Sequence, residues 1–195
     1  AESGAAGSVR FDYQTRHLFL EDEYAAIEVT YTDGGGEQTD PLATTEEVIL
    51  QPRQKDAAFV HSIQGAQRVI EGDYRWRDTV ETYLDVSDGN HVSYAPVNLR
   101  NINAITFRVS ADTASTIEVR LDEPEGEKLG EISVADDPKT TGESRHFQEV
   151  TMPISDPGGT HELFLVFRGP STKQTQLLRM DWLRFAGAGV AASTQ

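Results

Sequence analysis

The sequence predicts an all-β protein, a two-sheet antiparallel sandwich with little helix. The first observation is alternation: Ile117, Val119 and Leu121 alternate with charged side chains, which is the period of a half-buried strand. The second is a continuous apolar run from Leu163 to Phe167, which indicates a strand covered on both faces. The third is that short segments of this kind recur from residue 103 to residue 185, separated by Gly, Pro and Asp, as in sandwich folds.

The chain divides into four segments by composition. Residues 1–8 are small and polar and are expected to be disordered, and residues 187–195 form a tail of the same character. Residues 9–47 are expected to form a β extension that packs on the sandwich, because Ala26–Tyr31 alternates and Asp33 with three glycines then breaks the pattern. Residues 48–186 form the sandwich, although residues 51–72 have no clear period.

Composition excludes several functional classes. The 195 residues carry a net charge of −15, which argues against nucleic acid as a partner, because phosphate binding needs concentrated Lys and Arg. No apolar run is long enough to insert into a membrane. The chain has no Cys, which excludes disulfides and thiolate metal sites. The acidity itself is typical of solubility or of adaptation to salt, and it also attracts cations such as calcium.

The sequence also lacks the signatures of an enzyme. It has no G-x-S-x-G, H-E-x-x-H or phosphate-loop motif. The five His residues are scattered without the spacing of metal ligands. Paired acids are too frequent in so acidic a chain to indicate acid–base catalysis, so we expect no catalytic activity.

Five segments, in this order, resemble the family 6 carbohydrate-binding modules. They are GNHVSYAPVNL, TIEVRLDEPEGEKLGEISV, FQEVTMPI, the GTH segment at 159–161 with its apolar continuation, and Asp181-Trp182-Leu183 with Phe185. The resemblance covers roughly residues 48–185. It implies a jelly-roll sandwich that binds an oligosaccharide or polysaccharide without catalysis, as one domain of a larger secreted or periplasmic bacterial protein.

The resemblance also implies a sugar cleft at the loop end of the sandwich. Sugar rings stack on aromatic faces, while amides and carboxylates bond their hydroxyls; the candidates near the cleft are Tyr74, Trp76, Tyr83, Asp85 and Asn90. Tyr83 matches one aromatic wall of the family's cleft. The opposite wall, a Trp in the family, falls near Ser144, and the family's sugar-bonding Asn is replaced by Arg179. The cleft is therefore expected to be altered, with Tyr74 and Trp76 able to replace the missing wall.

A structural calcium ion is the second implication of the resemblance. The family's ligands include two acids, which align here with Gln51 and Arg53, and an Asp, which aligns with Asp181. Calcium prefers several charged oxygen ligands, and a guanidinium would repel it. We therefore expect Asp181, the one remaining candidate ligand, to pair with Arg53 instead of a metal.

Two functions remain open. The first is a non-catalytic module that binds a neutral glycan through a cleft near Tyr83. The second is a structural or assembly module that keeps the fold with a degenerate cleft and mediates domain packing or oligomerisation. The second hypothesis predicts an apolar contact surface on the extension, around Tyr24, Ile27 and Val29.

Overall fold

The computed structural model describes residues 24–36, 40–72, 80–140, 145–170 and 176–190. Within these ranges all regular structure is β and there is no helix, so no helix capable of crossing a membrane occurs among them. The strands are β1 (Ala25–Thr32), β2 (Ala43–Leu50), β3 (Gln54–Asp56), β4 (Ser62–Gln64), β5 (Gln67–Glu71), β6 (Glu81–Ser87), β7 (His91–Asn98), β8 (Ile102–Ala111), β9 (Ser115–Leu121), β10 (Lys128–Val134), β11 (Gln148–Pro153), β12 (Thr160–Arg168) and β13 (Gln176–Gly187).

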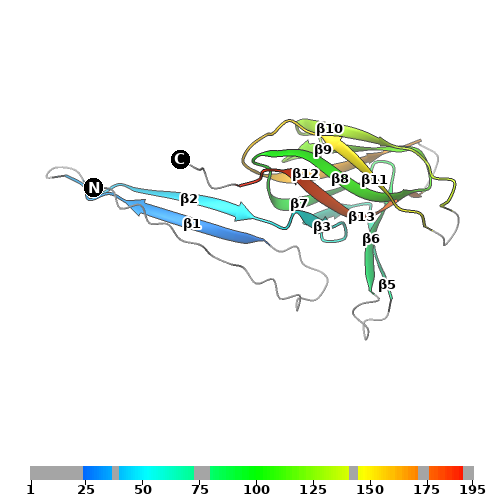
Figure 1. The fold of residues 1–195 in the computed structure, drawn as a ribbon, viewed down its shortest axis with the longest axis horizontal. Helices are drawn as coiled ribbons and strands as arrows, with labels where there is room; N and C mark the ends of the chain where they lie inside the picture. Colours follow the sequence, from blue (N-terminus) through cyan, green and yellow to red (C-terminus); the bar gives the residue numbers. More distant parts are fainter. Residues whose placement is uncertain (1–23, 37–39, 73–79, 141–144, 171–175, 191–195) are drawn as a thin grey trace.

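Two antiparallel sheets form the sandwich predicted from the alternation (Figure 1). One sheet has the order β10-β9-β12-β7-β4. The other has the order β11-β8-β13-β6-β5, and β3 pairs with the later part of β13 beyond the end of β6. The region without a clear period, residues 51–72, therefore consists of three short strands.

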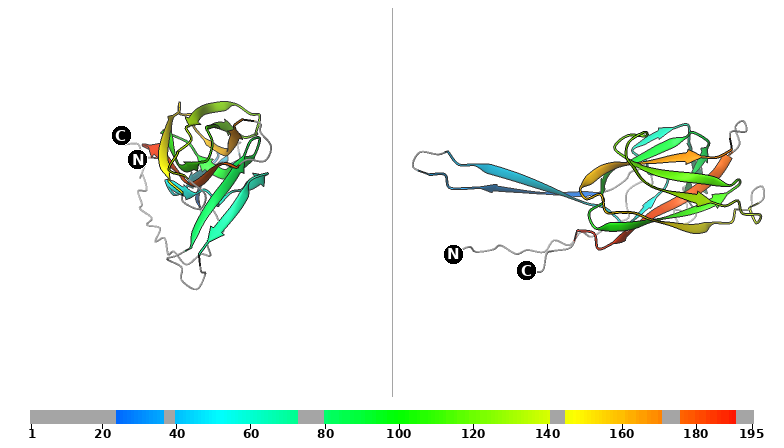
Figure 2. Two further views of the ribbon diagram at one scale, coloured as in Figure 1. Left: turned by 90° about the vertical axis from the view of Figure 1, so that its right-hand side faces the viewer. Right: turned by 90° about the horizontal axis from the view of Figure 1, so that it is seen from above.

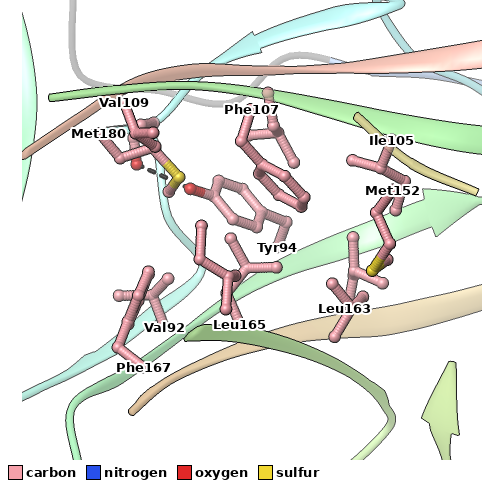
Figure 3. Packing of buried hydrophobic residues seen from close by; sticks show 14 of the residues in the cluster. Val92, Tyr94, Ile105, Phe107, Val109, Met152, Leu163, Leu165, Phe167 and Met180 are labelled. Carbon is pink, nitrogen blue, oxygen red and sulfur yellow. Dashed lines mark hydrogen bonds between the residues drawn. The ribbon is translucent and has the colours of Figure 1, made fainter. Parts of the chain in front are cut away.

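The core lies between the two sheets, as Figure 3 shows. Phe107 and Met180 from one sheet face Leu165 and Phe167 from the other, and all four are fully buried. Tyr94 crosses the same layer and donates a hydrogen bond from its hydroxyl to the carbonyl oxygen of Ala57 at 2.8 Å. This bond satisfies the one polar atom that so large a side chain brings into the core.

The two sequence patterns that predicted the sandwich are confirmed. In β9, Ser115, Ile117, Val119 and Leu121 are buried and the residues between them are half-buried. In β12 all five residues from Leu163 to Phe167 are buried, so this strand is covered on both faces.

The described part of the predicted extension, residues 24–36 and 40–47, differs from its prediction, whereas residues 9–23 and 37–39 lie outside the described residues. β1 and β2 pair with each other as a separate two-stranded hairpin, which projects away from the sandwich (Figures 1 and 2). The expected packing on the sandwich holds only at the base, where Ile49 is buried and its carbonyl oxygen accepts a bond from the side chain of Asn98. The reason is pairing: in the described part of the chain β1 and β2 pair with each other and with no strand of the two sheets, so only the base of the hairpin contacts the sandwich.

Candidate functional site

The outer face of the six-stranded sheet carries a cleft of about 680 Å³. In β6, Leu84 and Val86 point into the core, so Tyr83 and Asp85, which alternate with them, face outwards. In β13 the same alternation turns Arg179 outwards. The residues lining the cleft come from β5, β6, β8 and β13 and from the segment before β11: Glu71, Glu81, Tyr83, Arg108, Arg145, Phe147 and Arg179.

An irregularity in β13 shapes this face. The pairing of β13 with β8 shifts by one residue between Met180 and Trp182, which leaves Asp181 and Trp182 both half-buried while Leu183 returns to the core. A bulge of this kind re-aims side chains without ending a strand. It allows the Asp181 carboxylate to accept a hydrogen bond from Arg108 of the neighbouring strand.

Two aromatic rings meet in the cleft. The rings of Tyr83 and Phe147 stack with centroids 5.5 Å apart and an angle of 19° between their planes. The Arg179 guanidinium carbon lies 5.0 Å from the centroid of Tyr83, and that of Arg108 lies 4.8 Å from the centroid of Phe147. A sugar between two parallel rings would need about 7–8 Å, two contact distances of about 3.5–4 Å, so none fits between these two.

Arg179 is the most firmly held side chain of the cleft. It binds Asp85 through two bonds, Nε to Oδ1 at 2.7 Å and Nη2 to Oδ2 at 3.0 Å, and it binds Glu71 through Nη1 at 2.7 Å. Gln176 donates a further bond to the same Asp85 Oδ1 at 2.8 Å. The bonds to Asp85 raise the pKa of Arg179, so this guanidinium remains charged and positioned over Tyr83.

The other charged groups of the cleft are also paired. Arg108 binds Asp181, and Arg145 binds Asp112 at 2.5 Å. The Tyr83 hydroxyl donates a hydrogen bond to Glu81. Burial, followed by this bond, raises the pKa of Tyr83, so the phenol stays neutral at physiological pH. Each of the three arginines that line the cleft therefore has a carboxylate partner.

The structure brings only some of the predicted site residues together. Tyr83 and Arg179 line the cleft, and Asp85 lies beside it as the partner of Arg179. Asn90 does not line it, because its side-chain oxygen instead accepts a bond from the Ser87 amide in the turn between β6 and β7. Tyr74 and Trp76 lie outside the described residues, in the connection from β5 to β6.

Sequence reasoning missed Phe147. The expected second aromatic wall fell near Ser144, which lies outside the described residues, whereas Phe147 supplies the ring that stacks on Tyr83. The available signal was the position of Phe147, an aromatic residue that directly precedes β11 at the end of the same loop. Arg108 and Arg145 gave no such signal, because isolated arginines are common on exposed strands and loops.

The predicted pair of Arg53 and Asp181 does not form. Asp181 binds Arg108, whereas Arg53 donates to the carbonyl oxygens of Gly187 at 2.8 Å and Ala188 at 3.2 Å. Gly187 has φ of 142°, and a side chain there would collide with the Asn101 carbonyl, so glycine is needed for the chain to pass this point. Asp181 pairs with Arg108 because the bulge in β13 turns the Asp181 side chain towards β8.

Gln51, Arg53 and Asp181 do not fit the calcium ion that the resemblance implies. The guanidinium of Arg53 bonds the carbonyl oxygens of Gly187 and Ala188, which are therefore not available as ligands for a cation. The side chain of Gln51 bonds both the backbone amide and the carbonyl oxygen of Asn98. The Asp181 carboxylate is paired with an arginine. Among the described residues, moreover, no three His, Asp or Glu side chains come together as a metal site.

Comparison with protein families shows a match over most of the sandwich. The sequence model described as "Carbohydrate binding module (family 6)" matches residues 61–187, which include the whole cleft. The matched region is about two thirds of the chain and leaves out the β1–β2 hairpin.

Solved structures of similar fold agree with this match. A β-1,3-glucan binding module of the family from Bacillus halodurans is 28% identical, with a TM-score of 0.57, over 69% of this chain and 95% of that one. A family 6 module from Clostridium cellulolyticum, solved in complex with xylose, is 25% identical, with a TM-score of 0.55, over 68% of this chain and 95% of that one.

The curated relatives are longer proteins. Endo-1,4-β-xylanase A of Thermoclostridium stercorarium is 30% identical over 105 residues, which are 53% of this chain and 18% of that protein. Arabinoxylan arabinofuranohydrolase of Paenibacillus polymyxa is 28% identical over 103 residues, or 52% of this chain and 15% of that protein. The matched part of this chain thus spans less than a fifth of the length of either relative.

Proposed function

Because the chain belongs to family 6 of the carbohydrate-binding modules, we propose that the cleft around Phe147 binds a neutral glycan without catalysing its breakdown. The observation that carries this proposal is a half-buried aromatic ring, that of Phe147, in a cleft whose arginines are each paired with a carboxylate. A paired guanidinium offers its remaining N–H groups to hydroxyls, but it provides little net charge for the carboxylate of an acidic sugar.

The way in which a sugar would bind follows from the stacking of Tyr83 on Phe147. Tyr83 is only 7% exposed and is covered by Arg179, so it supports Phe147 and offers little surface of its own. The Arg108 side chain is 40% exposed and pairs with the single carboxylate of Asp181, whereas that of Arg179 is 11% exposed and pairs with two. Arg108 is therefore the side chain that an incoming sugar ring displaces from Phe147. Glu81 and Arg145 then bond the hydroxyl groups of the sugar.

The relatives support the ligand class and the context. The named ligands of the two solved modules, β-1,3-glucan and xylose, are neutral sugars. The curated relatives are by name a xylanase and an arabinoxylan arabinofuranohydrolase, and they are several times longer than this chain. We therefore propose that the chain works beside a catalytic domain in a secreted or periplasmic protein and holds it on its polysaccharide.

A glycan array and affinity gels with neutral and uronate-containing polysaccharides test the proposal. Wild type should bind a neutral glycan, and Phe147→Ala should weaken binding at least about tenfold through the loss of stacking. Trp182→Ala is the matched control, because this half-buried aromatic lies on the same sheet but does not line the cleft. Arg108→Ala should retain binding, since it uncovers Phe147. Equal loss in Phe147→Ala and Trp182→Ala, or preference for uronates, would contradict the proposal.

A second candidate function is a structural or assembly module with a degenerate cleft. The observation that favours it is the stacking of Tyr83 on Phe147, which leaves no slot for a sugar ring between them. This candidate predicts that wild type binds none of the glycans in the same screen, while the fold remains intact. The exposed hairpin would then be the functional surface.

Arg53 bonds the carbonyl oxygens of Gly187 and Ala188, where the last strand of the sandwich ends. We propose that the sandwich needs no calcium at this position, because Arg53 already provides a positive charge to the carbonyl oxygens of Gly187 and Ala188. A guanidinium bonds two carbonyl oxygens at once, with directed N–H groups.

A further inference from the structure

The β1–β2 hairpin has two unlike faces. Residues directly opposite each other in an antiparallel pair point to the same side, so the register from Ala25 opposite Leu50 to Thr32 opposite Ala43 assigns each side chain to a face. We call one side the apolar face of the hairpin; it carries Ala25, Ile27, Val29, Tyr31, Val48 and Leu50, together with Thr44 and Glu46.

The apolar face is exposed. Val29 is 60% exposed and Tyr31 is 68% exposed, and the hairpin projects from the sandwich in Figure 1 and in the right-hand view of Figure 2. The opposite face carries Ile49, which is buried at the base, and further out Glu28 directly opposite Glu47, a like-charge pair that opposes strand pairing. A two-stranded ribbon is marginally stable on its own in water, so a partner that covered the apolar face would stabilise this hairpin.

The charge of the hairpin restricts the partner. Residues 24–50 contain six acids and no Lys or Arg: Glu28, Asp33, Glu37, Asp40, Glu46 and Glu47. A second copy of the chain would bring the same six acids against these, in a protein whose net charge is already −15. Charge complementarity therefore favours a basic partner over self-association.

The edges of the hairpin indicate how that partner binds. β1 and β2 pair only with each other in the described part of the chain, so the outer edge of each strand presents unpaired backbone N–H and C=O groups. An open edge beside an apolar face accepts an extended segment as an additional strand, with alternate side chains on the apolar face. The matched region begins at residue 61, so the hairpin is an addition to the glycan-binding module.

We infer that the hairpin docks an extended polypeptide segment with alternating apolar and basic side chains, from another domain or another protein. The apolar side chains of this segment cover Val29 and Tyr31, and its basic side chains neutralise Glu28 and Glu47. This inference deepens the assembly function named above, and it holds whether or not the cleft binds a glycan.

A labelled synthetic peptide of alternating Lys and Val, with an alternating Glu and Val peptide as its charge control, tests the inference by fluorescence anisotropy on the full chain. The variant Val29→Thr/Tyr31→Thr keeps strand propensity and every charge while it removes apolar surface. Ile63→Thr is the matched control, because Ile63 is a 44% exposed apolar residue on β4, away from the hairpin. The double variant should bind the Lys–Val peptide at least about tenfold more weakly, and the control should bind like wild type.

Three results would overturn the inference. The first is equal binding of the Lys–Val peptide to wild type and the double variant, or no binding at all. The second is a wild-type dimer in light scattering that the double variant loses, which would make a second copy the occupant. The third is hydrogen-exchange protection of residues 9–20 that is lost in the double variant, which would assign the face to this chain's own N-terminal segment.

Discussion

The cleft and the hairpin are both β surfaces with aromatic and acidic side chains, but their surroundings differ. In the cleft, Tyr83 and Phe147 are stacked and each has a guanidinium against its ring. On the hairpin, Tyr31 is 68% exposed and the acids have no Lys or Arg near them in the sequence from 24 to 50. The difference lies in the arginines, which neutralise the acids and cover the rings in one region and are absent from the other.

The comparison indicates where stability and where binding capacity reside. The six-stranded sheet packs on a second sheet, and the arginines of its cleft are paired with carboxylates. In the described part of the chain the hairpin has no second layer, and residues 24–50 contain no Lys or Arg to pair with its acids. Stability should therefore depend on the sandwich, and the hairpin should tolerate substitution until a partner binds.

The largest expected effect is on the free energy of unfolding, which should respond to a substitution in the sandwich core but not to one on the hairpin. Leu165→Ala in the core should lower the free energy of unfolding by about 3 kcal/mol, because Leu165 is fully buried and its removal leaves a cavity. Val29→Thr on the hairpin should change it by less than about 0.5 kcal/mol. Urea denaturation followed by tryptophan fluorescence measures both. A comparable loss in the two variants would mean that the hairpin folds as part of the core.

The next effect concerns the arginine that fixes the cleft. Arg179→Ala should cost about 2–3 kcal/mol, because Asp85 and Glu71 lose their arginine in a site where its side chain is only 11% exposed, and Asp85 keeps only the bond from Gln176. Arg168→Ala is the control: this side chain is 52% exposed and lies 3.8 Å from Glu118, so it should cost less than about 1 kcal/mol. An equal decrease in the free energy of unfolding of both variants, measured by urea denaturation, would show that burial does not strengthen the ion pairs of Arg179.

A smaller effect should appear as a change in pH dependence. Burial raises the pKa of Asp56, which accepts bonds from Ala58 and Thr82. The folded state then holds a proton that the unfolded state releases, so stability should fall as pH rises from the unfolded pKa of about 3.9 through the raised value.

Asp56→Asn should remove this loss and flatten the stability profile, with little change at lower pH. Asp136→Asn removes one charge from an exposed site and is the control. Thermal unfolding at a series of pH values compares the two variants. A profile unchanged in Asp56→Asn would show that burial of this carboxylate does not cause the slope.

The smallest expected effect is that of calcium. The midpoint of thermal unfolding should be the same in calcium and in excess chelator, because Arg53 already binds the carbonyl oxygens of Gly187 and Ala188. Arg53→Gln, which loses the charge, should unfold at a lower temperature, again without a response to calcium. A chelator-dependent midpoint in wild type would refute this, and metal analysis would then identify the ion.

The sandwich could be predicted because the alternation of apolar and polar residues within each long strand is visible in the sequence. Ile117, Val119 and Leu121 face one core, and a period of two needs no knowledge of neighbouring strands. Residues 51–72 gave no signal, because strands of three to five residues are shorter than the window in which a period can be detected.

The site was harder to predict, because it depends on which strands are neighbours. Tyr83 and Arg179 were identified from the sequence, but their contact requires β6 to lie beside β13. The partner of Asp181 is decided by a one-residue bulge, and such a shift moves a side chain from one neighbour to another. Phe147 reaches Tyr83 from the segment that precedes β11, a contact that no local pattern encodes.

The junction between hairpin and sandwich also has a mechanical consequence. At about 3.3 Å per residue, two strands of eight residues form an arm of about 26 Å. Force applied at the tip would reach the body through Leu50–Arg53, where Gln51 is bonded to Asn98 and Arg53 to Gly187 and Ala188. These bonds share the load in parallel, so the hairpin would act as a lever that turns a small rotation at its base into a large displacement of whatever it holds.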